Sequence, residues 1–394
     1  MDLMTASHEW ATRPDDQRFS TLEDLEAACK RMADAACIAR RQISDLRAVA
    51  TEGDILLQGP KGDPARMTHH AFGQLSRLAH APAEFLRALP APLAADVLND
   101  RLPRRTGEDS PAAQILFYQN GSLLTRAFMT ESYDLLWDHR VVAQVRQWAQ
   151  RDGWRVPPAR PVRPGQRGTR PATADDVVTC GHATLGIRVG DPIADAGLYA
   201  SDHDCFIFLV RPGEAIDGGG YALNRGVLIR NSEVGECSFQ LTHFNFDSVC
   251  GNHIIWGASN VQVIRTRHVK GTREVSGRTL QRAALGYSRM MQALPPADAL
   301  SAKIAAARRV QIGATDEEVV DRCCAVAKVK SLPLLTRATI QSAIDAARES
   351  PRYGNPYSKW GLVNGLTEVS QRGGHADDRA ALDIQAGRLL EIDF

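Results

Sequence analysis

The segment from Pro157 to Pro171 constrains the fold more than any other part of this sequence. It holds five prolines and two glycines within fifteen residues. Proline lacks the amide hydrogen that a helix needs and fixes its own φ, so the segment cannot form a helix and its rings favour an extended backbone. We therefore predict a linker over residues 157–175, with separately organised regions before and after it.

The patterns on either side of this linker predict an α+β protein. Between residues 176 and 275, short apolar or alternating runs separated by glycine-rich turns are typical of strands, as in 204–210 and 237–246. We expect a central antiparallel sheet in this region. It would be flanked by N-terminal helices and a hairpin in 1–156 and by a helical C-terminal region in 276–394.

Local signals place several elements more closely. Ser20-Thr21-Leu22-Glu23 has the pattern of a capping box, which predicts a helix that begins after Ser20. Asn120-Gly121 stands between two apolar runs and predicts the turn of a β-hairpin. The apolar spacing of the C-terminal region predicts helices at roughly 279–293, 298–309, 315–328, 336–349, 358–370 and 376–388.

The composition is that of an ordinary globular chain. Lys and Arg number 47 against 46 Asp and Glu, and 44% of the residues are hydrophobic, which excludes a polycationic tail and global disorder. No apolar run approaches the roughly 20 residues that span a bilayer, so no membrane partner is expected. The first residues do not resemble a signal peptide, and the eight cysteines form no Cys-x-x-Cys pair. We expect a cytoplasmic protein with reduced thiols.

The first of two basic stretches runs from Arg140 to Arg170, where eight arginines accompany a single acid, Asp152, for a net charge of +7. One interpretation is a solvated, flexible loop. The other is an arm that lies on a phosphate backbone, which guanidinium groups recognise well. The arginines of such an arm are Arg160, Arg163, Arg167 and Arg170.

The second basic stretch, residues 265–289, has seven basic residues and one acid, for a net charge of +6. Two of its arginines alternate as on one face of a strand, and two are four apart as on one face of a helix. The stretch is either a solvated surface or a platform for nucleic acid, with Trp256 and Tyr287 available to stack on bases. The candidate contacts are Arg265, Arg267, Lys270, Arg273, Arg278 and Arg282.

Histidines and cysteines form the other candidate site. Cys250 and His253 have Cys-x-x-His spacing, and thiolate and imidazole are the usual ligands of zinc. The segment from Cys237 to His243 alternates like a strand, however, and lacks the tight turn that normally presents zinc ligands. The residues therefore suit a sheet core as well as a site for zinc or another divalent metal. The candidate ligands are His203, Cys237, His243, Cys250 and His253.

Several motifs of catalysis are missing from the sequence. It contains no Gly-x-Ser-x-Gly elbow, no Gly-x-x-x-x-Gly-Lys-Ser/Thr loop and no Gly-x-Gly-x-x-Gly that opens a helix. No Ser, Cys or His has a spacing that singles out a triad. The sequence therefore assigns no catalytic residue, no reaction and no cofactor beyond the metal considered above.

Several strings of residues resemble a known family. They are Asn231-Ser232-Glu233-Val234-Gly235-Glu236-Cys237-Ser238-Phe239, Val249-Cys250-Gly251-Asn252-His253-Ile254-Ile255-Trp256-Gly257, Arg265-Thr266-Arg267-His268, Thr68-His69-His70-Ala71-Phe72-Gly73-Gln74-Leu75, Arg126-Ala127-Phe128 and Trp360-Gly361-Leu362-Val363-Asn364-Gly365. Together they are similar to the phage and plasmid proteins grouped as domain of unknown function 932, and the likeness covers most of the chain. The resemblance implies no activity. By association it points to the DNA metabolism of mobile elements or to counter-defence.

These observations lead to one main expectation and two alternatives. We expect a DNA-binding protein of phage or plasmid replication and recombination, with single-stranded DNA favoured, annealing as a possible activity and a homo-oligomer as a possible assembly. A metal-dependent enzyme acting on nucleic acid and a protein that inhibits a host defence complex remain open. Bound metal would favour the first alternative, and DNA binding that vanishes with salt would favour the main expectation.

Overall fold

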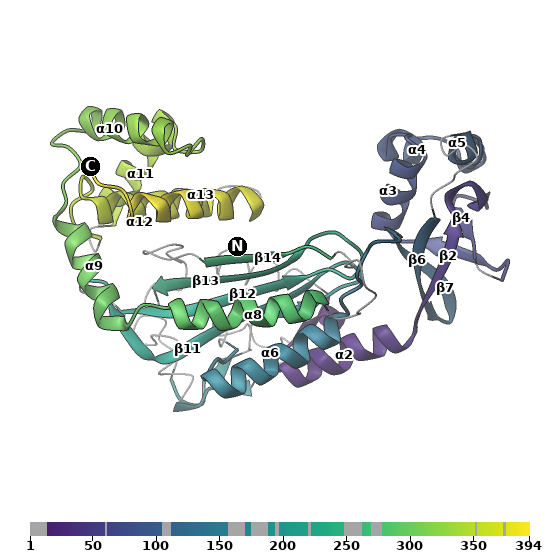
Figure 1. Ribbon diagram of the computed structural model, residues 1–394, viewed down its shortest axis with the longest axis horizontal. Helices are drawn as coiled ribbons and strands as arrows, with labels where there is room; N and C mark the ends of the chain where they lie inside the picture. Colours follow the sequence, from purple (N-terminus) through teal and green to yellow (C-terminus); the bar gives the residue numbers. More distant parts are fainter. Residues whose placement is uncertain are drawn as a thin grey trace.

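The computed structural model has an α+β fold in which two lobes rise from a central sheet (Figure 1). It describes residues 14–59, 61–104, 112–156, 170–174, 188–193, 197–219, 222–247, 262–268, 278–350, 353–372 and 376–394. One lobe is an N-terminal sheet with its helices, and the other consists of the C-terminal helices. The predicted fold class is confirmed.

The central sheet has the strand order β1-β10-β11-β12-β13-β14, and all neighbouring strands are antiparallel. Its strands are β1 (Arg18–Phe19), β10 (Leu198–Ala200), β11 (Cys205–Asp217), β12 (Ala222–Asn231), β13 (Phe239–Asp247) and β14 (Gln262–Thr266). The strands from β10 onward come from the region where the sequence predicts a sheet. The edge strand β1 is added from the N-terminal region.

Three helices from distant parts of the chain cover one face of this sheet (Figure 1). They are α2 (Leu22–Asp34), α6 (Asp138–Asp152) and α8 (Arg278–Ala293). Alternate strand residues such as Ile207, Val227 and Leu241 pack against the apolar stripes of these helices and are almost fully buried. The resulting core holds the central sheet and its helix layer together.

The start of α2 differs by one residue from the capping box that the sequence suggests. Thr21, not Ser20, is the N-cap, and its Oγ1 accepts a hydrogen bond of 3.1 Å from the amide of Asp24. The expected pairing of Ser20 with Glu23 is therefore wrong. With Thr21 as the cap, Leu22 and Leu25 both reach the core, and that burial selects the register.

The N-terminal lobe contains a second sheet of order β2-β6-β7-β5-β4-β3. Its strands are β2 (Ala36–Gln42), β3 (Ala48–Ala50), β4 (Ile55–Gln58), β5 (Pro64–Met67), β6 (Ala112–Asn120) and β7 (Ser122–Thr130). The hairpin predicted at Asn120-Gly121 is the β6–β7 turn, where Gly121 has a φ of +73°. The helices of this lobe are α3 (His69–Leu78), α4 (Ala83–Ala88) and α5 (Ala91–Arg104), with a short 3₁₀ turn at Ile43–Asp45, whereas the 3₁₀ turn at Asp15–Gln17 leads into β1 of the central sheet.

The C-terminal lobe is helical, as the sequence predicts. Its helices are α9 (Ala297–Arg309), α10 (Asp316–Val329), α11 (Arg337–Glu349), α12 (Lys359–Arg372) and α13 (Ala376–Leu389), each within two residues of its expected bounds. Gly365 lets α12 approach α11 closely, because a Cβ at this position would lie 1.9 Å from the carbonyl oxygen of Ala343. The lobe has its own apolar core.

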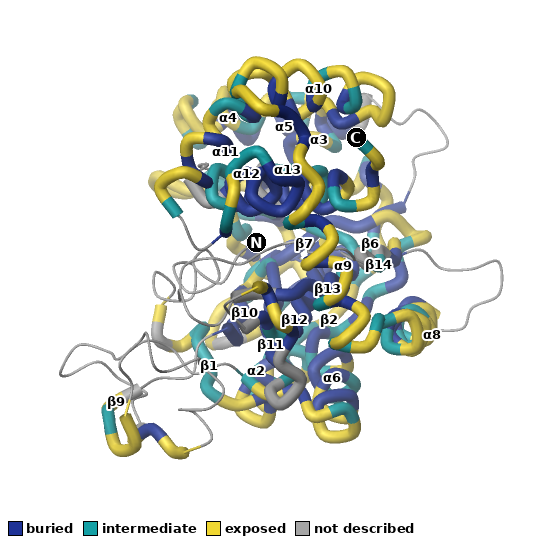
Figure 2. The backbone as a smooth tube through the Cα atoms, turned by 90° about the vertical axis from the view of Figure 1, so that its left-hand side faces the viewer, coloured by how far each residue is buried: buried dark blue, intermediate teal, exposed yellow. Residues whose placement is uncertain are grey.

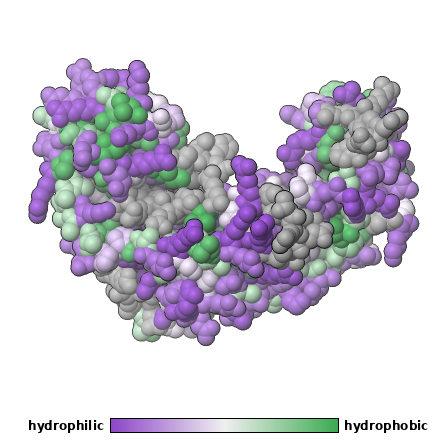
Figure 3. All heavy atoms as spheres, viewed as in Figure 1, coloured by the Kyte–Doolittle hydropathy of each residue, from purple (hydrophilic) through white to green (hydrophobic). Residues whose placement is uncertain are grey.

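A short strand pair, β8 (Arg170–Pro171) with β9 (Pro192–Ile193), stands apart from both larger sheets. In Figure 2, β9 lies on one side of the central sheet and α8 on the other. Figure 3 shows a deep hollow in the surface between the two lobes. Within the described residues, no helix combines the length and apolar character needed to cross a bilayer.

Candidate functional site

Helix α8 carries a row of exposed arginines along one flank. Its sequence, RTLQRAALGYSRMMQA, contains no acidic residue. Thr279, Ala283, Tyr287 and Met290 are buried against the sheet. Arg278, Arg282 and Arg289 follow the spacing i, i+4 and i+11, so they share a different flank, and all three are exposed. We call these three residues the arginine row.

The row extends over about 16 Å, because eleven residues separate its ends at about 1.5 Å per residue. None of its guanidinium groups forms an ion pair with a carboxylate of the described residues. Leu285, 53% exposed, lies on the same flank. The sequence analysis did not name Arg289 as a contact, although its helical spacing from Arg278 is the signal that would have identified it.

A close contact fixes α8 against the edge strand β14. Gly286 faces Ile264, and a Cβ at Gly286 would lie 2.7 Å from the Cγ2 atom of Ile264. The helix therefore needs glycine at this point to approach the strand. The contact places the arginine row beside the edge of the central sheet.

Buried Asp134 brings Arg267 close to the start of the row. The amide of Asp134 donates to the carbonyl of His268 at 3.2 Å, and its Oδ2 accepts from Oγ1 of Thr279 at 2.7 Å. His268 and Thr279 therefore meet at one residue. Their preceding neighbours are the exposed Arg267 and Arg278. The chain at Arg267 therefore lies near the start of α8, which carries Arg278 and Arg282, two other arginines predicted as contacts.

The other predicted contacts are not brought to this site by the described residues. Arg170 belongs to β8, which pairs with β9, and Figure 2 shows β9 and α8 on opposite sides of the central sheet. Arg265 pairs with Gln240 in the sheet, but its side chain is not described. Arg160, Arg163, Arg167, Lys270 and Arg273 lie outside the described residues, as does Trp256.

Tyr287 cannot stack on bases, and that expectation is wrong. The ring is 1% exposed and stacks on Trp148 of α6, with 4.1 Å between centroids. Its hydroxyl donates to Oδ2 of Asp152 at 2.5 Å and accepts from Nε1 of Trp154 at 2.9 Å. Burial raises the pKa of Tyr287. The residue lies on the apolar stripe of α8, which faces the core.

The candidate metal ligands that the structure describes do not form a group that could hold a metal ion. His203 follows β10, where its Nδ1 lies 2.8 Å from Oδ1 of Asp202, whereas Cys237 lies in the loop before β13. His243 is 1% exposed in the middle of β13, opposite Val227. Burial raises the pKa of Cys237 to about 11, which disfavours the thiolate that zinc needs. Cys250 and His253 lie outside the described residues.

No group of three or more His, Cys, Asp or Glu side chains among the described residues is arranged to hold a metal ion. The described cysteines, Cys29, Cys37, Cys205, Cys237, Cys323 and Cys324, are all free thiols.

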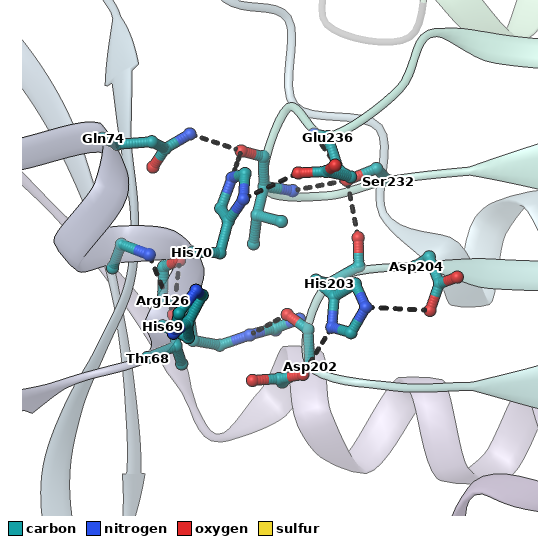
Figure 4. A network of polar contacts seen from close by, with 12 residues as sticks. Thr68, His69, His70, Gln74, Arg126, Asp202, His203, Asp204, Ser232 and Glu236 are labelled. Atoms are coloured by element: carbon teal, nitrogen blue, oxygen red, sulfur yellow. Dashed lines mark hydrogen bonds and ion pairs between the residues drawn. The ribbon is translucent and has the colours of Figure 1, made fainter. Parts of the chain in front are cut away.

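A polar seam joins the N-terminal lobe to the end of the central sheet (Figure 4). Arg126 of β7 donates from Nη1 to Oε2 of Glu233 at 3.0 Å, and from Nη2 to the carbonyl of Asp202 at 2.6 Å. The other oxygen of Glu233 accepts from the amide of Asp138 at 2.9 Å. Burial and the charge of Glu233 raise the pKa of Asp138 well above its usual range.

Helix α3 contributes the exposed side of the same seam. Nδ1 of His70 lies 2.7 Å from Oε2 of Glu236, and Nε2 of Gln74 donates to the carbonyl of Val234 at 2.9 Å (Figure 4). Residues 68–75, 126–128 and 231–239, three of the strings quoted for the family resemblance, therefore meet here. Their contacts are mostly with one another, which indicates that the seam fixes the lobe in place.

The chain matches no protein-family model, no curated protein and no solved structure. The resemblance to domain of unknown function 932 therefore stays a prediction from the quoted residues.

Proposed function

We propose that the protein binds DNA through its phosphate backbone, along the arginine row and Arg267. The observation that carries this proposal is the row itself: exposed guanidinium groups aligned on an acid-free helix, without ion-pair partners among the described carboxylates. Guanidinium groups bind phosphate oxygens in a bidentate manner, and neutralising phosphates releases counterions.

The arginine row can contact phosphates, but the described residues of α8 around it offer no aromatic side chain that could stack on a base. Tyr287 is buried, and Leu285 is the only large apolar side chain on this flank of α8. Phosphate contacts position a nucleic acid without specifying its sequence. We therefore expect binding that depends weakly on sequence. Because Tyr287 is buried, stacking by this ring no longer supports a preference for single-stranded DNA. The preference has to be measured by comparing single-stranded with duplex DNA.

The test is fluorescence anisotropy of a labelled single strand and of the matching duplex, over a series of salt concentrations. We expect affinity to fall linearly with salt on logarithmic axes. The triple variant Arg278→Gln/Arg282→Gln/Arg289→Gln should bind more weakly and lower the slope by about 2 for single strands, at about 0.7 per lost contact. All three side chains are exposed, so the fold should be unchanged.

A matched control removes the same charge elsewhere. Arg31, Arg77 and Arg101 are exposed on α2, α3 and α5 and have no ion-pair partner among the described residues. The variant Arg31→Gln/Arg77→Gln/Arg101→Gln should keep the slope of the parent. An equal decrease in the salt slope of the two triple variants would indicate a general charge effect. It would reject the arginine row as the binding site. A parent that binds neither DNA at low salt would reject the function.

A further inference from the structure

A cavity of about 310 Å³ lies where the C-terminal lobe joins the rest of the molecule. It is open on one side and is bordered by α9, by the first residues of α12 and by the residues after α13. Its lining residues are Lys303, Ile304, Ala306, Ala307, Val310, Lys359, Trp360, Leu390, Glu391 and Asp393. None of these residues belongs to the arginine row or to the polar seam.

Lys359 is the unusual member of this lining, because the residue is largely buried and its ammonium group has few partners. The residue is 8% exposed, and Nζ donates to the carbonyl of Leu390 at 3.0 Å. That is the one hydrogen bond of Nζ among the described residues, although an ammonium group has three donors. Burial lowers the pKa of Lys359, and Asp393 and Glu391 oppose this effect only in part.

The backbone around Lys359 adds to the positive potential without using the free donors. Lys359 is the first residue of α12, so it lies at the positive end of the helix dipole. Two amides of this first turn are already bonded, since Lys359 N donates to Val310 O at 2.9 Å and Gly361 N donates to Ser358 Oγ at 3.0 Å. The Lys359 side chain keeps donors for a ligand, and the exposed side chain of Lys303 adds others at the same cavity.

The other lining residues of the cavity indicate which chemical groups the rest of a ligand would have. Ile304, Trp360 and Leu390 offer apolar surface, and pockets of this kind bind an apolar body while a few polar groups fix its head. Lys303 is exposed at the rim and adds a second positive charge. Glu391 and Asp393 are also exposed at the rim, which disfavours ligands with more than one negative charge.

We propose that this cavity is a binding site for a small monocarboxylate with an apolar body, whose carboxylate accepts hydrogen bonds from the two free donors of Lys359. The apolar body would lie against Ile304, Trp360 and Leu390. A ligand there touches α9, α12 and the chain terminus at once, so its binding stabilises the attachment of the C-terminal lobe. This site is independent of DNA binding by α8.

The experiment is calorimetric titration of the full chain with acetate, butyrate and hexanoate. Hexanol, which is neutral, and hexylamine, which is a cation, probe the same apolar body without the negative charge. We expect the Kd of the carboxylates to fall about fourfold for each added methylene group, at about 0.8 kcal/mol each, until the walls are covered. Hexanol and hexylamine should bind at least tenfold more weakly than hexanoate. Equal affinity for hexanol, or no heat from hexanoate at about 10 mM, overturns the proposal.

Two variants locate the binding. Lys359→Met keeps the length of the side chain and removes its charge, and hexanoate binding should be lost. Ala306→Phe leaves Lys359 intact and fills the cavity from an exposed position, so it keeps the test valid if Lys359→Met does not fold. It should also abolish binding. Hexanoate binding that survives in a folded Lys359→Met or in Ala306→Phe overturns the site.

Discussion

Arg126 on β7 and Glu233 after β12 form an ion pair across the seam between the N-terminal lobe and the central sheet, with side chains 3% and 0% exposed. Removing one member of such a pair leaves a buried charge without a partner, which typically costs about 3–5 kcal/mol. We expect Arg126→Met to lower the free energy of unfolding by about this amount, because Glu233 would lose its cation.

Glu233→Gln should lower the free energy of unfolding less than Arg126→Met does. Without the charge of Glu233, Asp138 can ionise and supply the negative charge near Arg126. The double variant Arg126→Met/Glu233→Gln should recover part of the loss of Arg126→Met. Urea denaturation of the three variants measures these differences. A double variant whose loss equals the sum of the two single losses would mean that the pair is not coupled.

The raised pKa of Asp138 predicts a dependence of stability on pH. An unfolded aspartate loses its proton near pH 4, whereas folded Asp138 keeps its proton to a higher pH. Between these two values the folded state binds more protons, so this group makes the protein less stable as pH rises. Asn in place of Asp138 still offers Oδ1 to the Nδ2 of Asn231, which is the contact seen at 2.7 Å.

The test compares the Tm of the parent with that of Asp138→Asn between about pH 4.5 and pH 7.5. The parent should lose stability relative to the variant as pH rises. A difference in Tm that stays constant over this range would mean that Asp138 titrates as an ordinary aspartate.

Two glycines in helices should respond in opposite directions to the same substitution. Gly365→Ala would push a Cβ into the carbonyl of Ala343 at 1.9 Å, so α12 and α11 have to separate, at a cost of about 2 kcal/mol or more. Gly73→Ala in α3 meets no atom closer than Nη2 of Arg87 at 4.0 Å, and should stabilise the protein by about 0.5–1 kcal/mol. Chemical denaturation measures the free energy of unfolding of both variants. Losses of stability of equal size in the two would refute the close contact between α11 and α12.

Local patterns predicted the elements whose formation depends on nearby residues. The β6–β7 turn follows from Asn120-Gly121, and the C-terminal helices follow from apolar spacing that repeats over several turns. The register of α2 was misplaced at Ser20, because Ser20 and Thr21 are both good caps. The choice between them depends on which leucines reach a core made by distant strands.

The candidate site depends on long-range packing to a greater degree. Composition identified the basic stretch 265–289, and helical spacing aligned Arg278 with Arg282. The sequence could not separate Tyr287 from these arginines, because only the position of α6 shows which flank of α8 is buried. Nor could it predict that Arg170 would belong to a strand that pairs with β9, because that pairing joins residues more than 20 positions apart. No sequence pattern singles out Lys359 as a binding residue, because an isolated lysine at the start of a helix is common.

The helix layer over the central sheet has a consequence for how the chain is synthesised. Helices α2 and α8 share one core although more than 240 residues separate them, so many native contacts span long stretches of chain, which slows folding. During translation, every strand of the sheet leaves the ribosome before α8 does. Until α8 emerges, no helix packs over Leu241 and Ile264, and Trp148 lacks the Tyr287 ring on which it stacks. A nascent chain stalled after β14 therefore presents an apolar surface that chaperones recognise, and indole fluorescence would report the arrival of Tyr287.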